Sequence, residues 1–208
     1  MPRLLQFLLT ICTFLLVAGL TAGADLESAK RAYQQKDYAA ALKDSRALAE
    51  QGNANAQVLL GRMYLMGQGV LKDPDTAVKW FRAAAVQGNS EGEFLLGSMY
   101  LLPRSDVAEG LKWIRLSAEQ GNQDAQLLLG KAYMEGAPEL PRDPVQAETW
   151  LRLAARDNLP FYHAQLTAAE KEMSPEQIAK GKALADEWKP KVGAVPPAKT
   201  AAQPGQKN

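Results

Sequence analysis

The chain has 208 residues, with 24 lysines and arginines against 23 aspartates and glutamates, and it contains one cysteine and one histidine. A formal net charge of +1 argues against a nucleic-acid partner, because dedicated nucleic-acid binders normally carry a basic excess. A lone cysteine and a lone histidine leave no internal disulfide and no ligand set for a structural zinc site.

The first 24 residues have the pattern of an export signal. Arg3 precedes an apolar run from Leu4 to Leu20, and Ala22-Gly23-Ala24 supplies the small residues that a signal peptidase recognises. We predict cleavage after Ala24, which removes Cys12 and yields a periplasmic or secreted protein of 184 residues. The run approaches the roughly 20 residues that span a bilayer, so an uncleaved inner-membrane anchor is the alternative. No second long apolar segment follows.

A repeat of about 35 residues organises the centre of the chain. The segments 55–64, 91–100 and 124–133 are similar and each ends in tyrosine, at spacings of 36 and then 33 residues. A second block follows each one, with tryptophans at 80, 113 and 150. The number of residues within each kind of block is the same in all three copies, whereas the connection from the first block to the second varies in length. Two segments of fixed length joined by a variable loop indicate a helix–turn–helix repeat, with clearest copies at 53–88, 89–121 and 122–158.

Capping residues mark the predicted helix boundaries. Asp73-Pro74 and Asp143-Pro144 should begin second helices, because the carboxylate accepts free backbone N–H groups and proline suits the first helical position. Gly88 and Gly121 should end these helices in the left-handed conformation, and the asparagine after each should cap the next helix.

Each predicted first helix also contains a glycine in its interior. These residues are Gly61, Gly97 and Gly130. Because glycine inside a helix costs about 1 kcal/mol relative to alanine, we predict that the paired helix approaches closely at each of them.

The ends of the array are less regular. Residues Leu26 to Gln35 and Tyr38 to Gln51 should form an earlier helix pair, and Phe161 to Glu172 and Pro175 to Trp188 a last one. We therefore expect about five antiparallel helix pairs over residues 25–188, with the outer pairs acting as caps. Residues 189–208 are rich in Pro, Ala, Lys and Gln and contain no acid, which predicts a disordered tail that either aids solubility or tethers the protein to an anionic surface.

The repeat resembles the Sel-one-like repeat (SLR) family, a branch of the tetratricopeptide-type α-solenoids. The first copy carries its motifs as Leu60–Tyr64 (Leu-Gly-Arg-Met-Tyr), Gly67–Val70 (Gly-Gln-Gly-Val), Asp73, Trp80 and Gly88. The second copy lacks the Gly-x-Gly turn, and the third keeps only its first glycine. Three copies in phase make the resemblance specific.

This resemblance implies a right-handed superhelix whose concave face binds other proteins. Exported bacterial members of the family resemble adaptors in envelope assemblies or in host contact, and some cysteine-rich members are linked to β-lactams or peptidoglycan fragments. The mature chain lacks cysteine, which argues against that branch.

No residue pattern indicates catalysis, a metal or a cofactor. His163 has no second histidine or cysteine to form a metal site, and we expect it to cap or pack on the last helix pair. Trp80, Trp113 and Trp150 occupy one repeat position among small residues, which favours burial in the core over a surface that stacks sugars.

Candidate partner-binding residues lie in two polar columns of the first helices, because first helices line the groove in solenoids of this kind. One column holds Arg62, Ser98 and Lys131, and the other holds Gln57, Glu93 and Gln126; both could instead be simply solvated. The sequence favours a monomeric, exported scaffold that binds a protein or peptide in the groove. The alternative is a peptidoglycan-associated module that binds or cleaves cell-wall fragments.

Overall fold

The computed structural model describes residues 25–101, 106–137 and 139–191 of the chain. Within these ranges there are ten α-helices and no strand, and none of the helices is long and apolar enough to cross a membrane. The predicted signal at 1–24 and residues 192–208 of the predicted tail lie outside the described residues. The helices are α2 (Leu26–Gln34), α3 (Tyr38–Glu50), α4 (Ala54–Met66), α5 (Pro74–Ala85), α6 (Ser90–Tyr100), α7 (Val107–Glu119), α8 (Gln123–Glu135), α9 (Pro144–Ala154), α10 (Pro160–Glu170) and α11 (Pro175–Glu187).

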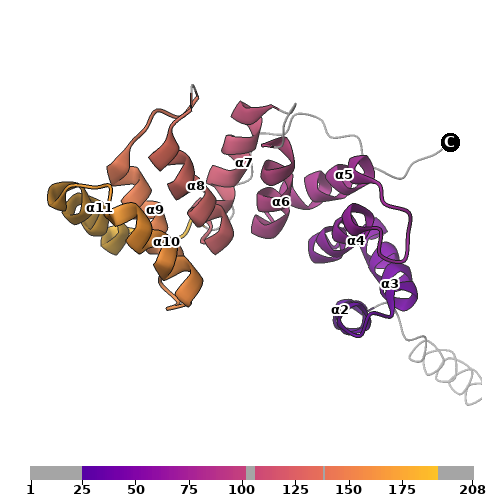
Figure 1. Ribbon diagram of the computed structural model, residues 1–208. Helices are drawn as coiled ribbons and strands as arrows, with labels where there is room; N and C mark the ends of the chain where they lie inside the picture. The colour runs from indigo at the N-terminus through magenta and orange to yellow at the C-terminus, as the bar shows by residue number, and fades with distance from the viewer. Residues whose placement is uncertain (1–24, 102–105, 138, 192–208) are drawn as a thin grey trace, which may run out of the picture.

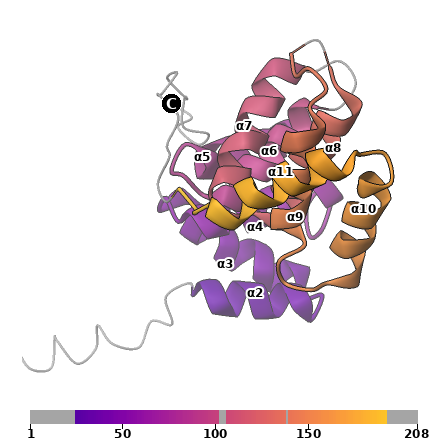
Figure 2. The ribbon, with the colours of Figure 1, turned by 90° about the vertical axis from the view of Figure 1, so that its left-hand side faces the viewer.

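The helices are stacked in chain order into an arc, which Figure 1 shows from α2 at one end to α11 at the other. Helices α2 and α3, α4 and α5, α6 and α7, and α8 and α9 pack as pairs, and each pair packs on the next. The first helices α2, α4, α6, α8 and α10 follow the inner side of the arc, and the second helices follow the outer side (Figures 1 and 2). The chain is thus an α-solenoid.

The predicted capping residues occupy the expected positions. Asp73 accepts a hydrogen bond from the backbone N–H of Thr76 (3.0 Å), and Asp143 accepts from two N–H groups of the first turn of α9. Asn89 and Asn122 cap α6 and α8 in the same way. Gly88 and Gly121 have φ angles of +77° and +96°, so the left-handed exits predicted for them are confirmed.

The predicted close approaches at the helix glycines are confirmed. A Cβ at Gly61 would lie 2.5 Å from the Phe81 ring, and a Cβ at Gly130 would lie 2.7 Å from Leu151 Cγ. At Gly97 the nearest atom would be the backbone oxygen of Gly110, at 2.9 Å. Trp80, Trp113 and Trp150 are all buried, as expected for core positions.

A column of arginines joins successive pairs. Arg46 donates to the Tyr64 hydroxyl (3.0 Å), and Arg115 donates to the Tyr133 hydroxyl (3.1 Å). Arg82 lies over the ring of Tyr100, 5.6 Å from its centroid. Each arginine is on a second helix and its partner lies 18 residues later on the next first helix, so an arginine–tyrosine contact recurs at three boundaries.

The C-terminal end differs from the expected last pair. Helices α10 and α11 both pack against α9, and α11 makes the more extensive contact there, rather than with α10 as we expected. Gly181 is the physical reason, because a Cβ at this residue would meet the backbone oxygen of Val145 at 2.9 Å. The hydroxyl of Thr149 also donates to the Gly181 carbonyl (3.3 Å). Helix α11 therefore covers the flank of α9 that would otherwise face solvent.

Candidate functional site

A depression of about 230 Å³ lies between the first helices of the first three pairs. Lys30, Tyr33 and Gln34 of α2 line it on one side. Asn55, Val58, Leu59 and Arg62 of α4 form its centre, and Glu91 of α6 closes the other side. The spacings of three, four and seven residues place these side chains on one face of each helix, so the groove follows directly from the stacking of first helices.

The groove has an apolar floor and a polar rim. Val58 and Leu59 are buried, with 4% and 8% of their surface exposed. Arg62 forms an ion pair with Glu91, and both side chains are about half exposed, at 44% and 47%. Exposed pairs of this kind contribute about 0–1 kcal/mol, so the arginine can exchange its partner at little cost. An apolar floor with exchangeable polar groups suits the side chains and backbone of a bound peptide.

Hydrogen bonds between first helices fix the shape of this face. Asn89 donates from Nδ2 to Oδ1 of Asn55 across α4 and α6 (2.8 Å). The Tyr33 hydroxyl donates to Gln68 of the α4–α5 loop (2.7 Å), which holds the aromatic ring at the edge of the groove. The groove is therefore formed before any partner binds.

One of the two predicted binding columns is buried, so the expectation that it lies on an open surface is wrong. Gln57, Glu93 and Gln126 expose 5%, 0% and 2% of their surface. Gln57 and Gln126 each donate from Nε2 to the backbone carbonyl eight residues earlier, in Ala49 and Ala118, at 3.1 Å in both cases. These side chains close the turn between adjacent helix pairs.

Glu93 occupies the same position with a carboxyl group in place of the amide. Its Oε2 accepts a hydrogen bond from Gln120 (2.8 Å), and its buried Oε1 has no hydrogen-bond partner among the described residues. Burial raises the pKa of Glu93 to about 8, although the bond from Gln120 acts in the opposite direction. A protonated Glu93 carries an O–H donor where the two glutamines carry an amide N–H.

In the other predicted column, only Arg62 lines the groove. Ser98 and Lys131 are partly buried on α6 and α8, and the structure does not bring them together with Arg62. The residues that sequence reasoning missed are those of α2, which we took as part of a cap. The spacing of Lys30, Tyr33 and Gln34 along α2 was the signal that could have identified them.

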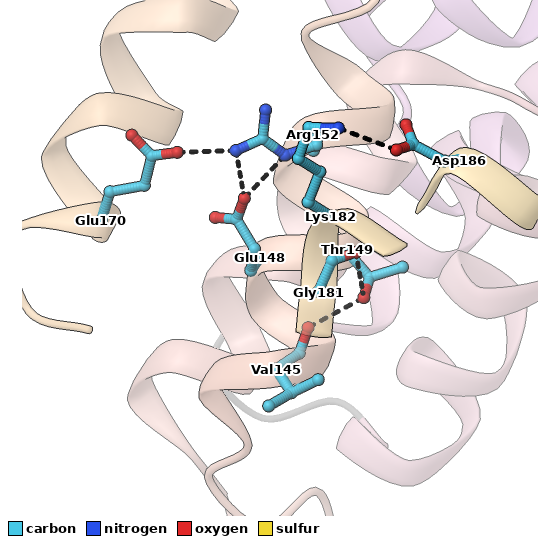
Figure 3. A network of polar contacts seen from close by, with 8 residues as sticks. All are labelled: Val145, Glu148, Thr149, Arg152, Glu170, Gly181, Lys182 and Asp186. Carbon is cyan, nitrogen blue, oxygen red and sulfur yellow. Dashed lines mark hydrogen bonds and ion pairs between the residues drawn. The ribbon is translucent and has the colours of Figure 1, made fainter. Parts of the chain in front are cut away.

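A second buried carboxylate lies in the C-terminal polar network of Figure 3. Glu148 is fully buried and accepts from Arg152 Nε (2.7 Å), and Arg152 also contacts Glu170 of α10 (2.7 Å). Burial raises the pKa of Glu148, and the hydrogen bond and charge of Arg152 partly offset this effect. Arg152 lies 18 residues before Glu170, so the pair continues the arginine column and has a structural role.

The described residues contain no cluster of three or more His, Cys, Asp or Glu that could hold a metal. Glu91 is the single carboxylate that lines the groove. His163 lies in α10, and its Nε2 is 3.1 Å from the side-chain oxygen of Asn158, just before that helix.

Comparison with known proteins identifies the repeat. The family model described as the Sel1 repeat matches residues 54–89, 90–122 and 123–159, one residue away from the boundaries expected from sequence. A search of the curated proteins found no match.

Two solved structures are similar to this chain. A Sel1 repeat protein from Oxalobacter formigenes has 26% sequence identity and a TM-score of 0.65, over 78% of this chain and 70% of that one. A protective antigen of uropathogenic Escherichia coli strains, which displays an SLR fold, has 26% identity and a TM-score of 0.53. That match covers 81% of this chain and 46% of the antigen, so this chain spans less than half of it.

Proposed function

This chain belongs to the Sel1 repeat family, whose solenoids generally serve as scaffolds for protein–protein interaction. We propose that it is an exported scaffold for a partner protein. A segment of the partner binds in the groove between α2, α4 and α6. The observation that carries this proposal is the groove itself, in which three successive first helices contribute an apolar floor and a polar rim.

The chemistry of the groove favours a peptide segment. Val58 and Leu59 can accommodate an apolar side chain, and the amides of Gln34 and Asn55 can bond to the backbone of an extended segment. Lys30 and Arg62 supply positive charge at the rim, in exposed pairs with Glu27 and Glu91. A carboxylate of the partner can take the place of Glu27 or Glu91 in these ion pairs. The displaced glutamate is exposed to solvent, so no buried charge is left unpaired.

Export is supported by the sequence pattern of residues 1–24. Cleavage after Ala24 would release the solenoid into the periplasm or the medium. An uncleaved segment would instead anchor the protein in the inner membrane, with the solenoid on the periplasmic side. Both outcomes place the groove in the cell envelope or beyond, so its partner is to be sought there.

Site-specific crosslinking in cells tests the proposal. A photoreactive amino acid at Gln34, in the groove, should give a discrete set of protein adducts that mass spectrometry identifies. The same group at the exposed Lys79 of α5 should not give them. Identical adducts at both positions, or none at Gln34, would contradict a partner in this groove.

Alanine variants then measure the contribution of the groove to partner binding. Replacing Lys30 and Arg62 together should weaken binding of the identified partner about tenfold, which corresponds to about 1.4 kcal/mol. Replacing the exposed Lys72 and Lys79 together removes the same charge elsewhere and should leave affinity unchanged. Loss of the adducts when purified muropeptides are added before irradiation would instead assign the groove to cell-wall fragments.

A further inference from the structure

A second groove lies along α7 and is bounded by the α8–α9 loop. It has a volume of about 290 Å³. Its apolar surface comes from Leu111 and Leu116 of α7 and from Leu140 of the loop. Lys112, Arg115 and Glu119 border it with charges of both signs. Because both signs of charge border the groove, a charged occupant would lie near a charge of its own sign. An uncharged, apolar occupant avoids this repulsion.

The chain itself arrives at this groove after α11. Trp188 packs against the core cluster that contains Leu111 and Leu140, and Arg156 lies over its ring, 5.3 Å from the centroid. The backbone N–H of Lys191 then donates to the carbonyl of Glu119 (2.8 Å), and its ammonium lies 3.2 Å from the Glu119 carboxylate. Glu119 is the last residue of α7 and lines the groove, so the end of the described chain is held at one end of the groove.

The residues that follow have the chemistry that the groove requires. The sequence from Val192 to Ala198 is Val-Gly-Ala-Val-Pro-Pro-Ala, without a charge before Lys199. Seven residues in an extended, proline-favoured conformation cover about 20 Å at roughly 3 Å each. Helix α7 has 13 residues and is therefore also about 20 Å long. The segment is long enough to follow α7 from its last residue to its first turn.

We propose that residues 192–198 bind along this groove, so that the C-terminal segment of the chain is its occupant. Lys191 starts the segment, and the side chains of Val192, Val195 and the two prolines cover Leu111, Leu116 and Leu140. The segment thereby extends the contact between the end of the described chain and α7 that Lys191 makes with Glu119.

Cysteine labelling of the full chain tests the proposal. Cys12 is the single cysteine of the chain, so with Cys12→Ser in place Ala108→Cys, in the groove, and Lys79→Cys, on α5, each report on one site. We expect maleimide to label Ala108→Cys several-fold faster when the chain ends at Lys191 than in the full chain. Labelling of Lys79→Cys should not change. Equal rates at Ala108→Cys in the two chains would overturn the proposal.

A point substitution and a peptide separate docking from folding. Val195→Asp in the full chain introduces a charge into the apolar contact and should accelerate labelling of Ala108→Cys as truncation does, with an unchanged circular dichroism spectrum. A synthetic peptide of residues 190–203 should slow labelling of the truncated chain, and the same peptide with Val195→Asp should not. Failure of the wild-type peptide to protect Ala108→Cys would count against the groove as its site.

Discussion

At one repeat position, two copies of the repeat have a side-chain amide nitrogen where the third has a carboxyl oxygen, and this difference affects local stability. Gln57 and Gln126 donate an amide hydrogen to a carbonyl of the preceding helix pair, whereas Glu93 at the same position can donate only when it is protonated. Burial raises the pKa of Glu93 to about 8, above the ordinary value of 4.5. The folded protein therefore holds a proton that the unfolded chain releases, and the contribution of Glu93 to stability is lost as pH rises from about 4.5 to 8.

Glu93→Gln should remove the contribution of this proton to the pH dependence of the free energy of unfolding. We expect the variant to match the wild type near pH 4.5 and to exceed its free energy of unfolding by about 1–3 kcal/mol at pH 8, the typical cost of an unsatisfied buried group. Urea denaturation at several pH values measures the difference. The converse substitution, Gln126→Glu, is the matched control and should introduce the same dependence. Parallel profiles for wild type and Glu93→Gln would contradict the assignment of this proton to Glu93.

The burial of this column was foreseeable in part. Its residues are Gln, Glu and Gln, nearly invariant between copies, whereas Arg62, Ser98 and Lys131 vary as a binding surface should. Near-invariance indicates a structural role. That the side chains turn back to a helix end depends on three-dimensional packing, and the repeat pattern alone does not show it.

At the scale of helices, glycine sets the distance within each pair. Gly61 lies against the ring of Phe81, so α4 and α5 approach more closely than two helices with β-carbons at this point. Alanine is the better helix former by about 1 kcal/mol, yet the new methyl group would enter an occupied site. Overpacking of a core costs about 1–3 kcal/mol and outweighs the gain in helix propensity.

Gly61→Ala should therefore destabilise the protein, and Phe81→Leu should partly rescue it. Thermal unfolding of both single variants and the double variant forms a double-mutant cycle. The double variant should lose less stability than the sum of the two single losses, because the smaller side chain leaves room for the methyl group. Strict additivity would show that the loss at Gly61 does not arise from contact with Phe81.

Helix positions were largely predictable from sequence, because capping residues act locally. Asp73, Asp143 and Ser174 each begin a helix where expected, and Ser174 forms the full capping box with Gln177. The packing of α11 on α9 was not predictable in the same way. It depends on Gly181, whose spacing matches no repeat glycine, and on contact between residues more than 30 positions apart.

At the scale of the whole molecule, the main packing of each helix is with its own pair or the adjacent one. The stability of such an array is close to the sum of the stabilities of its repeats and of the interfaces between neighbours. A destabilising substitution at one end should therefore affect that end alone. Helices α2 and α4 lie at one end of the arc and α11 at the other (Figure 1). The first groove is lined by α2, α4 and α6, whereas Trp188, directly after α11, packs on the core cluster of α7 to α9.

Trp188→Ala should increase amide hydrogen exchange in α7, α9 and α11 and leave α2 to α4 unchanged, because its partners are confined to that end. Tyr38→Ala is the reciprocal variant and should affect α2 to α4 alone, since Tyr38 packs in the N-terminal cluster and contacts Gln68. Exchange measured by mass spectrometry resolves the two regions. A uniform increase across all helices in either variant would show that the array unfolds as one unit.

The recurring arginine contact between pairs also bears on how such a gene changes. Arg46 and Arg115 donate to the hydroxyl of the following tyrosine, and Arg82 lies over the ring of its own, so the same two residue types meet at each of these boundaries. Unequal recombination that duplicates or deletes the 33 codons for residues 90–122 would join a second helix to a first helix that already fits it. The lineage can therefore gain length in the middle of the array while the groove of α2, α4 and α6 and the cover formed by α11 are inherited intact, whereas loss of this repeat would also remove Glu91 from the groove.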